Sequence, residues 1–188
     1  NSLIKGGDGD ERMSYFYEVL EPPLALFIVG AGNDAIPLCN FADVLGYKVT
    51  VIDGRANYAT RERFSSASSV MISRAEEIFS KINTDSRTAF VLMTHNYNYD
   101  LAVLRSLLKF DIPYVGCLGP LKRLERMKAE IAGQGITITN EQKDRIYGPA
   151  GIDLGSDNAE EIALSIISEI QRVIKKSSAI SLRDKHCV

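Results

Sequence analysis

The sequence predicts an α/β domain with a doubly wound, mainly parallel sheet between two layers of helices. Strand-like and helix-like segments alternate from residue 24 to residue 173, which is typical of right-handed strand–helix–strand units. The first strand-like segment, residues 24–29, is apolar throughout, as expected of a parallel strand buried on both faces. In such a sheet, ligands bind beyond the carboxyl ends of the strands, where the strand order reverses.

Five short apolar segments are expected to be the strands. They are residues 24–29, 47–52, 69–73, 88–94 and 113–117. The rule on ligand position therefore directs attention to the loops that follow residues 29, 52, 94 and 117.

The first expected helix follows residue 34 and ends at Gly46, because glycine commonly terminates a helix. Pro37 lies in its first turn, where a missing N–H costs little. Its apolar side consists of Ile36, Leu38, Phe41, Ala42 and Leu45.

Four further helices are expected, at residues 76–82, 99–109, 120–131 and from about 158 onward. Ser156 or Asp157 is expected to cap the last helix, with Glu160 and Glu161 in its first turn. The residues expected to face inward on the last three helices are Leu101, Leu104, Leu107, Leu108, Leu121, Leu124, Met127, Ile131, Ile162, Ala163, Ile166, Ile170 and Val173. Residues 146–155 between these helices are expected to form turns.

The 188 residues suit one domain. We expect residues 1–22 to be an arm or linker, residues 23–176 to be the ligand-binding domain, and residues 177–188 to be a polar tail. Residues 15–20 could add a short strand or pack as an arm.

The composition resembles that of an ordinary globular domain, with 45% hydrophobic and 24% charged residues. The formal net charge of −2 predicts no nucleic-acid partner, because such a partner requires a basic face. No apolar run approaches the roughly 18 residues of a membrane span, and no segment resembles a signal peptide. Three scattered cysteines predict neither a disulfide framework nor a zinc site. A cytoplasmic location is therefore expected.

The loop after residue 29 reads Gly30-Ala31-Gly32-Asn33-Asp34-Ala35, a G-x-G-x-x-A pattern. The first glycine permits a tight turn, the second lets backbone approach a phosphate, and the helix N-terminus offers N–H groups to an anion. Asp53 follows Gly32 by 21 residues, at the end of the second expected strand. This is near the spacing of an acid that holds a ribose hydroxyl. The arrangement predicts a Rossmann-like nucleotide or cofactor site that includes Gly30, Gly32, Asn33 and Asp53.

Three charged or polar residues near this turn have two interpretations each. Asn33 is either a ligand contact or the N-cap of the helix. Asp34 stabilises the first helical turn but would repel a diphosphate if it pointed inward. Arg55 either meets a phosphate, as an arginine near this acid does in NADP sites, or is a solvated loop residue.

Thr94 and His95 follow the fourth expected strand. His95 could bind a ligand or act as an acid or base, or it could bond only its own loop. The sequence contains no Ser-His-Asp set around it and no cluster of metal ligands. A binding site without an evident catalytic apparatus is therefore predicted.

A second glycine turn, Gly116 to Gly119, follows the fifth expected strand and leads into a helix that begins with Lys122 and Arg123 in its first turn. Cations there oppose the helix dipole, so either an anionic ligand or solvent compensates them. Cys117 is interpreted first as a small buried hydrophobe, and second as a thiol beside the pocket.

An ordered set of segments resembles the xanthine dehydrogenase accessory factor family, XdhC/CoxI, and specifically its C-terminal Rossmann domain. The segments are residues 27–32, 49–55, 93–96, 100–104, 114–119, 148–155, 160–163 and 165–166. The sequence departs from the family pattern at Asn33, where a histidine is usual, and at residues 120–123, where Ser-Arg-Arg-Lys is frequent. The family's separate N-terminal domain, with its cysteine, has no counterpart in these residues.

The resemblance implies a maturation factor that binds molybdenum cofactor (molybdopterin), assists its sulfuration and delivers it to a molybdenum hydroxylase such as xanthine dehydrogenase. A cysteine desulfurase is a further partner under this interpretation. A second copy of the chain is also considered as a partner, because parallel-sheet domains commonly pair along helices or edges. The resemblance also implies a set of ligand contacts, namely Gly30, Gly32, Asp53, Arg55, Thr94, His95 and the turn from Gly116 to Gly119, and it draws Asp153 toward the same surface. The residue pattern itself adds Asn33, Lys122 and Arg123 to the expected binding residues.

Two other functions remain open from the sequence. The glycine turn with Asp53 also suits an NAD(P)-dependent oxidoreductase. A nucleotide-sensing regulatory domain would bind the same kind of ligand without turnover.

Overall fold

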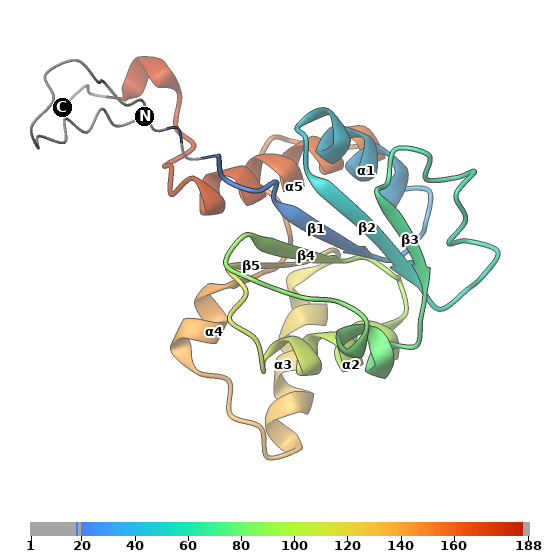
Figure 1. Ribbon diagram of the computed structural model, residues 1–188. Coiled ribbons are helices and arrows are strands. Elements are labelled where there is room, and N and C mark those ends of the chain that lie inside the picture. Colours follow the sequence, from blue (N-terminus) through green and yellow to red (C-terminus); the bar gives the residue numbers. More distant parts are fainter. Residues whose placement is uncertain (1–17, 19, 186–188) are drawn as a thin grey trace, which may run out of the picture.

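A computed structural model describes residue 18 and residues 20–185 of the chain. Its centre is a six-stranded sheet, all of whose strands run parallel, in the order β3-β2-β1-β4-β5-β6 (Figure 1). The strands are β1 (Ala25–Val29), β2 (Lys48–Asp53), β3 (Ser69–Ile72), β4 (Thr88–Leu92), β5 (Tyr114–Cys117) and β6 (Ile146–Tyr147). The predicted doubly wound, Rossmann-like fold is thus confirmed, and the strand order reverses between β1 and β4.

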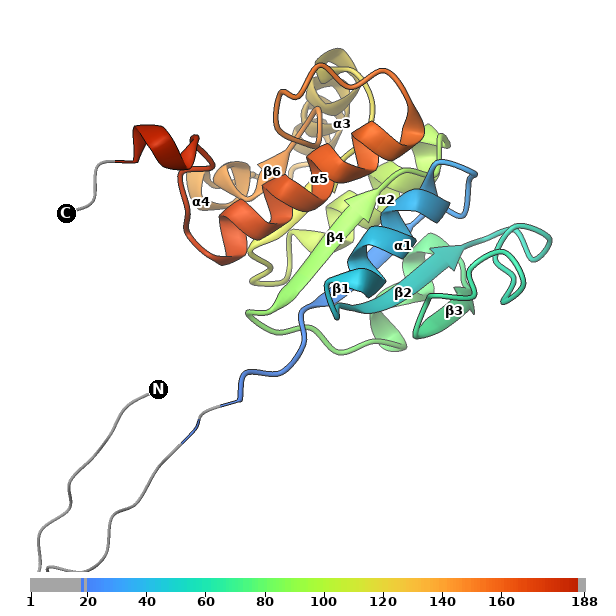
Figure 2. The ribbon, with the colours of Figure 1, turned by 90° about the horizontal axis from the view of Figure 1, so that it is seen from above.

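Helices cover both faces of the sheet (Figures 1 and 2). The helices α1 (Ala35–Val44) and α5 (Ala159–Ile174) lie on one face, and the 3₁₀ helix η1 (Ala75–Ser80), α2 (Tyr97–Leu107) and α3 (Leu121–Gly133) lie on the other. The short α4 (Asn140–Asp144) precedes β6, and a 3₁₀ turn, η2 (Leu182–Asp184), lies near the end of the described chain. The result is the three-layer arrangement expected of alternating strands and helices.

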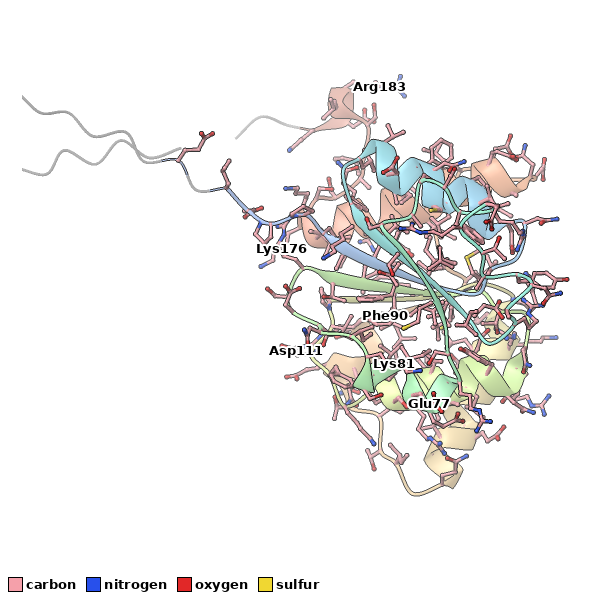
Figure 3. The ribbon with its side chains drawn as sticks, turned by 45° about the vertical axis from the view of Figure 1, so that its right-hand side comes forward. Glu77, Lys81, Phe90, Asp111, Lys176 and Arg183 are labelled. Atoms are coloured by element: carbon pink, nitrogen blue, oxygen red, sulfur yellow. The ribbon has the colours of Figure 1, made fainter. Side chains whose placement is uncertain are left out.

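Alternate side chains of β1 enter two separate cores, because successive strand residues point to opposite faces. Leu26 and Ile28 pack toward α1 and α5, whereas Phe27 and Val29 pack toward α2 and α3. In the second core Phe27 stacks on Phe90, with ring centroids 4.8 Å apart, and Phe90 lies between the sheet and its helices (Figure 3). Burial on both faces explains why the sequence of this strand is uniformly apolar.

Residues 139–158 differ most from the sequence prediction. The expected turn region contains β6, which adds a sixth strand beside β5, and α4 precedes it with a capping box between Thr139 and Gln142. The last helix is capped by Asn158, whose Oδ1 accepts the Glu161 N–H at 2.8 Å. The predicted cap at Ser156 or Asp157 is therefore wrong, because Asn158 is the polar residue placed three positions before that N–H.

Two residues expected to face inward are instead exposed. Leu45 is 45% exposed and Leu121 is 52% exposed. Both lie at helix ends, Leu45 just after α1 and Leu121 at the first position of α3, where the neighbouring layer no longer covers the helix. Most of the other expected core residues are buried, namely Leu38, Ala42, Leu101, Leu104, Leu107, Leu124, Met127, Ile131, Ala163, Ile166 and Ile170. The remainder are partly buried: Ile36, Phe41, Leu108, Ile162 and Val173.

The short strand considered at residues 15–20 falls almost wholly outside the described residues. Residues 177–185 are exposed, including the η2 turn. None of the described helices is long and apolar enough to span a membrane.

Candidate functional site

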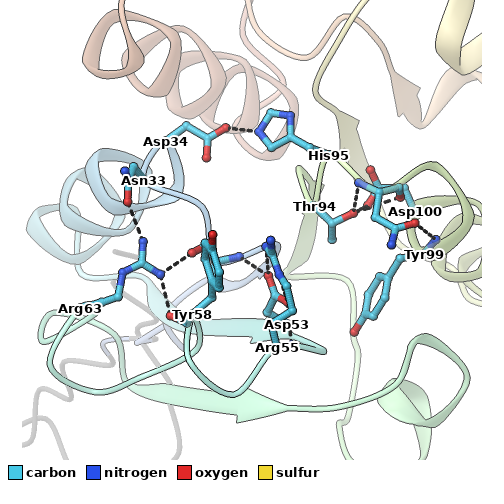
Figure 4. Close-up of polar contacts among 12 residues, drawn as sticks. Asn33, Asp34, Asp53, Arg55, Tyr58, Arg63, Thr94, His95, Tyr99 and Asp100 are labelled. Carbon is cyan, nitrogen blue, oxygen red and sulfur yellow. Dashed lines mark hydrogen bonds and ion pairs between the residues drawn. The ribbon is translucent and has the colours of Figure 1, made fainter.

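The carboxyl ends of β1, β2 and β4 bring most of the predicted site together. Val29 pairs in register with Ile52 of β2 and Leu92 of β4. The residues that follow these three positions, the Gly30 turn, Asp53 and Thr94–His95, therefore emerge at one edge of the sheet (Figure 4). This is the switch point at which doubly wound sheets bind ligands.

Gly30 is required by the fold itself. Its φ is +125°, and a Cβ at this position would lie 2.5 Å from the Met93 carbonyl oxygen and 2.8 Å from the Thr94 nitrogen. The ends of β1 and β4 can approach each other this closely only where no side chain intervenes. The first glycine of the turn thus serves strand packing.

Gly32 differs, because the protein does not explain its missing side chain. Its φ is not positive, and a Cβ there would meet only the flexible side chain of Asp34. Among the described residues, the N–H groups of Gly32, Asn33 and Asp34 have no hydrogen-bond acceptor. They lie at the N-terminus of α1, where unpaired N–H groups and the helix dipole favour an anion. A ligand over the second glycine would therefore contact free N–H groups but would have to displace the movable carboxylate of Asp34.

Asn33 is not the helix cap. The N-cap position of α1 is Asp34, which makes no capping bond with its side chain. The Asn33 Oδ1 instead accepts a bond of 2.8 Å from Arg63 Nη2. The capping interpretation of Asn33 is therefore wrong, and its side chain serves to join two loops.

Asp53 is buried beneath the turn and is fully bonded. Its Oδ2 accepts the Ala31 N–H at 2.8 Å and Arg55 Nη2 at 2.8 Å, and its Oδ1 accepts the Arg55 N–H at 2.9 Å and Nε at 3.0 Å. Burial alone raises the pKa of this carboxyl, but the bonds from Arg55 and Ala31 outweigh burial and lower the pKa overall. Asp53 is thus an ionised anchor for the turn and for Arg55.

Arg55 lies over the ring of Tyr58, with 3.9 Å between the guanidinium carbon and the ring centroid. Its side chain is 47% exposed, whereas that of Asp53 is 4% exposed. The stacking and the paired bonds to Asp53 hold the guanidinium in one plane. Arg55 is thus an exposed loop arginine that is also bonded to Asp53, and the prediction that it meets a phosphate is not tested.

Arg63 was not among the predicted site residues, yet it joins the β2–β3 loop to the glycine turn. Its Nη1 donates to the carbonyl oxygens of Ala31 at 2.6 Å and Tyr58 at 2.7 Å, and its Nη2 donates to Asn33 (Figure 4). Its guanidinium carbon lies 5.2 Å from the Tyr58 ring centroid. The one sequence signal for this role is that Arg63 is a further arginine in the same loop as Arg55.

His95 and Asp34 face each other across the mouth of the site. His95 Nε2 lies 2.7 Å from Asp34 Oδ2, and the His95 side chain is 68% exposed. His95 has a φ of +57°, a left-handed conformation that is uncommon for residues other than glycine. The Asp34 carboxylate is therefore held toward His95 by this pair.

Thr94 and Arg123 belong to a buried network centred on Asp100. Asp100 is 0% exposed, and it accepts Thr94 Oγ1 at 2.7 Å and Arg123 Nη2 at 2.7 Å. Burial raises the pKa of the Asp100 carboxyl, although both of these bonds oppose the rise. The charge of Arg123, expected to face solvent or an anionic ligand, is thus compensated by Asp100, whereas Lys122 is exposed.

Tyr99 closes the underside of the site and was also missed by sequence reasoning. Its hydroxyl donates to the Ser73 carbonyl oxygen at 2.7 Å, and its ring lies against Gly54, where an added Cβ would be 3.2 Å from Cε2. Burial and the nearby Asp53 carboxylate raise the pKa of Tyr99, so its hydroxyl remains protonated. The packing of α2 against the β2 end gives no signal in the local sequence.

The second glycine turn is determined largely by packing. A Cβ at Gly116 would lie 2.7 Å from Tyr114 Oη and 3.1 Å from Ala150 Cβ, and Gly119 has a φ of +113°. Cys117 is 2% exposed, and burial raises its pKa to about 12. The buried-hydrophobe interpretation of Cys117 fits these values, because a reactive thiol needs exposure and a lowered pKa.

Beyond β5 and β6 lies an open groove with a volume of 490 Å³. Gly119, Asp153 and Ser156 line it, together with apolar residues of the 118–120 and 149–154 segments. Asp153 is thus placed away from the Gly30 turn, on the β5–β6 side of the sheet edge. Since neighbouring strands lie about 4.8 Å apart, a ligand reaching from β2 to β5 would span about 14 Å.

No group of three His, Cys, Asp or Glu side chains that could hold a metal ion occurs in residues 18 and 20–185. The predicted cofactor-binding residues therefore form three groups. One surrounds the Gly30 turn, the second consists of Thr94 and Arg123, which bond to Asp100, and the remainder lie on the β5–β6 side. The arrangement suits binding of an anionic, elongated ligand.

Comparisons with known proteins agree with this description. The sequence is 29% identical over 171 residues to a Bacillus subtilis (strain 168) protein named as a probable xanthine dehydrogenase subunit, covering 91% of this chain and 49% of that protein. It is 26% identical over 170 residues to the uncharacterized protein YqeB of Escherichia coli (strain K12), covering 89% of this chain and 30% of that protein. The chain thus spans half or less of the length of these relatives.

A crystal structure described as a xanthine dehydrogenase from Bacillus halodurans superposes with a TM-score of 0.74 and 28% identity, covering 82% of this chain and 45% of that one. The family described as the XdhC Rossmann domain matches residues 26–170, which include every predicted site residue. The resemblance carried by the glycine turns and the 148–155 segment is thereby confirmed. The chain belongs to the XdhC Rossmann domain family.

Proposed function

We propose that the chain is the ligand-binding domain of an accessory factor for a molybdenum hydroxylase such as xanthine dehydrogenase. In this function it binds molybdenum cofactor, or a related nucleotide, with a phosphate over residues 30–33. The observation that carries the proposal is the turn at residues 32–34, whose N–H groups have no acceptor among the described residues and whose Gly32 is approached only by the movable side chain of Asp34. The names of two relatives, both of which refer to xanthine dehydrogenase, support the choice of partner.

The residues present fit the organic part of such a cofactor. Its phosphate would be held by the N–H groups of Gly32, Asn33 and Asp34, because helix N-termini bind anions. Its heterocycle would extend toward the groove lined by Gly119 and Asp153. When bound, the cofactor supplies redox chemistry at molybdenum for the hydroxylase, whereas this chain's residues bind and orient it.

A binding role is favoured over catalysis by the bonds that engage the polar side chains. Asp53, Thr94 and Arg123 are each committed to partners within the protein. His95 is exposed and pairs with Asp34. We therefore propose a carrier of the cofactor, with a cysteine desulfurase and a second copy of the chain as further partners. A cytoplasmic site of action is part of the same proposal.

Equilibrium binding of purified molybdenum cofactor tests the proposal. Titration calorimetry would compare the chain with Gly32→Ala, and Gly133→Ala would serve as the matched control because a Cβ there meets nothing within 4 Å. We expect binding by the chain and by the control, and at least tenfold weaker binding by Gly32→Ala. Equal affinity of all three proteins, or no binding, would contradict the proposal.

The second candidate is an NAD(P)-dependent oxidoreductase, favoured by the strand order and the glycine turn. Thermal shift with NAD, NADH, NADP and NADPH separates the two. A dinucleotide at about 100 times its dissociation constant adds roughly 2.7 kcal/mol of stability. The absence of a shift in melting temperature with all four dinucleotides would therefore exclude this candidate. Binding without turnover of any hydride donor would instead identify a nucleotide-sensing domain.

A further inference from the structure

Asp53 has no acceptor position left for a ribose hydroxyl. An ionised carboxylate offers about four acceptor positions. Asp53 uses four, one for the Ala31 N–H and three for the backbone and side chain of Arg55. A ligand whose ribose carried two free hydroxyls would therefore have to displace Arg55 from a buried partner.

Arg55 occupies the acceptor positions of Asp53 that a ribose diol would otherwise use. One edge of its guanidinium is bonded to Asp53 through Nε and Nη2, and one face lies on the Tyr58 ring. Its Nη1 has no acceptor within the described chain, and 47% of the side chain is exposed. The remaining donors thus point outward from a guanidinium whose plane is already fixed.

Arg63 brings a second positive charge to the same place. It lies against Tyr58 from the side of the glycine turn, and its bonds go to two carbonyl oxygens and the neutral Asn33 amide (Figure 4). The arginine cluster formed by Arg55, Tyr58 and Arg63 thus holds two guanidinium groups against the single carboxylate of Asp53. The Asp34 carboxylate also lies at the mouth of the site, with its Oδ2 2.7 Å from His95 Nε2.

We propose that the arginine cluster binds a phosphate group carried on the ribose ring of the ligand, so that the site selects a phosphorylated ribose over a free diol. This inference rests on the nucleotide form of the proposed function, in which a related nucleotide lies over the glycine turn, because molybdopterin itself carries no ribose. Arginine suits this role because its planar donors bind phosphate oxygens in pairs. Asp53 is then a positioning residue that aims Arg55 and does not touch the ligand.

Calorimetry with nucleotide probes tests the inference. The probes are NADPH against NADH, and adenosine 2′,5′-bisphosphate against adenosine 5′-monophosphate. We expect the 2′-phosphorylated member of each pair to bind at least tenfold tighter. We also expect Arg55→Ala to remove this difference, and Arg55→Lys to retain part of it because the charge remains. Arg126→Ala is the matched control, since Arg126 likewise lies over a tyrosine ring, that of Tyr97 at 4.5 Å, but on α3.

The outcomes separate the inference from the function on which it rests. Equal affinity for both members of each pair, with or without Arg55, overturns the inference and leaves a nucleotide site in place. Binding of molybdenum cofactor that adenosine 2′,5′-bisphosphate does not displace also overturns the inference but supports the proposed function. Binding of no probe and no cofactor overturns both. Melting curves of each variant, recorded first, ensure that only folded protein is compared.

Discussion

The glycines near the ends of β1 and β5 both precede a helix, but their surroundings differ: Gly30 and Gly32 lie in the turn after β1, whereas Gly116 lies within β5 and Gly119 in the turn after it. Around Gly116, protein atoms occupy the space a side chain would need, and the following Arg123 is paired with the buried Asp100. Around Gly32 only the movable side chain of Asp34 lies where a side chain would be, and the guanidinium groups of Arg55 and Arg63 lie beside the turn together with the Asp53 carboxylate. Similar local sequence therefore serves packing near β5, whereas at the turn after β1 we propose that it binds a ligand. The predictions below test this difference, beginning with the largest expected effect.

Replacing Asp100 with Ala should destabilise the protein most. The change leaves the partly buried Arg123 and the hydroxyl of Thr94 without their shared carboxylate, and breaking a largely buried ion pair in this way costs about 3 kcal/mol. Urea denaturation would measure the loss. Lys122→Ala removes an exposed cation from the same helical turn and should change stability by no more than about 0.5 kcal/mol. Similar effects of the two substitutions would mean that Arg123 is not structurally committed.

Replacing Gly30 with Ala should cost about 3 kcal/mol, because it combines backbone strain with overpacking against the Met93 carbonyl. Gly32→Ala should cost less than about 1 kcal/mol, since only the flexible Asp34 side chain must move. Thermal denaturation of both variants, with Gly133→Ala as the control, measures the contrast. Equal destabilisation at residues 30 and 32 would remove the distinction between a structural and a ligand-binding glycine.

Asp53→Asn should cost about 2 kcal/mol at neutral pH, as expected when a charged acceptor of several hydrogen bonds is neutralised. The pKa of Asp53 is lowered in the folded protein, so its stabilisation is fully present above the unfolded-state value near pH 4 and is lost as the pH falls through the lower folded value. Denaturation curves between pH 6 and pH 2 should therefore fall less steeply for Asp53→Asn than for the unaltered chain. Parallel curves would show that Arg55 does not depend on the Asp53 charge.

His95→Asn should have the smallest effect on stability, within about 0.5 kcal/mol, because an exposed pair contributes little and asparagine tolerates a positive φ. Releasing Asp34 from His95 should nevertheless weaken binding of a phosphate-bearing ligand, since the free carboxylate can turn toward the N–H groups of the turn. Calorimetry with NADPH checks this. Unchanged binding would show that the His95–Asp34 pair does not influence the ligand.

The parts of the molecule that depend on local pattern were predictable from sequence. The apolar run of β1 and the glycine turn before α1 indicated the fold class and the location of Asp53 in the site. Their signals, buried strand and tight turn, lie within a few residues of chain. By contrast, β6 has only two residues, Ile146–Tyr147, and no periodicity can be read from so short a strand.

The partners of charged side chains were not predictable. Arg123 and Asp100 are 23 residues apart, and Arg63 and Asn33 are 30 apart. Whether such a charge meets solvent, a ligand or another side chain depends on how α2, α3 and the β2–β3 loop pack. The sequence therefore indicated where cations occur near the site but not which of them the fold had already neutralised.

The bonds of Arg63 have a consequence for motion. Residues 54–68 connect β2 to β3 without regular structure, and they are held by the buried Phe64 and by Arg63 on the glycine turn. Opening of either segment breaks the same bonds, so the backbone amides of both should show matching hydrogen–deuterium exchange protection. A ligand that binds to the turn would then slow exchange across the whole loop, including amides that it never contacts.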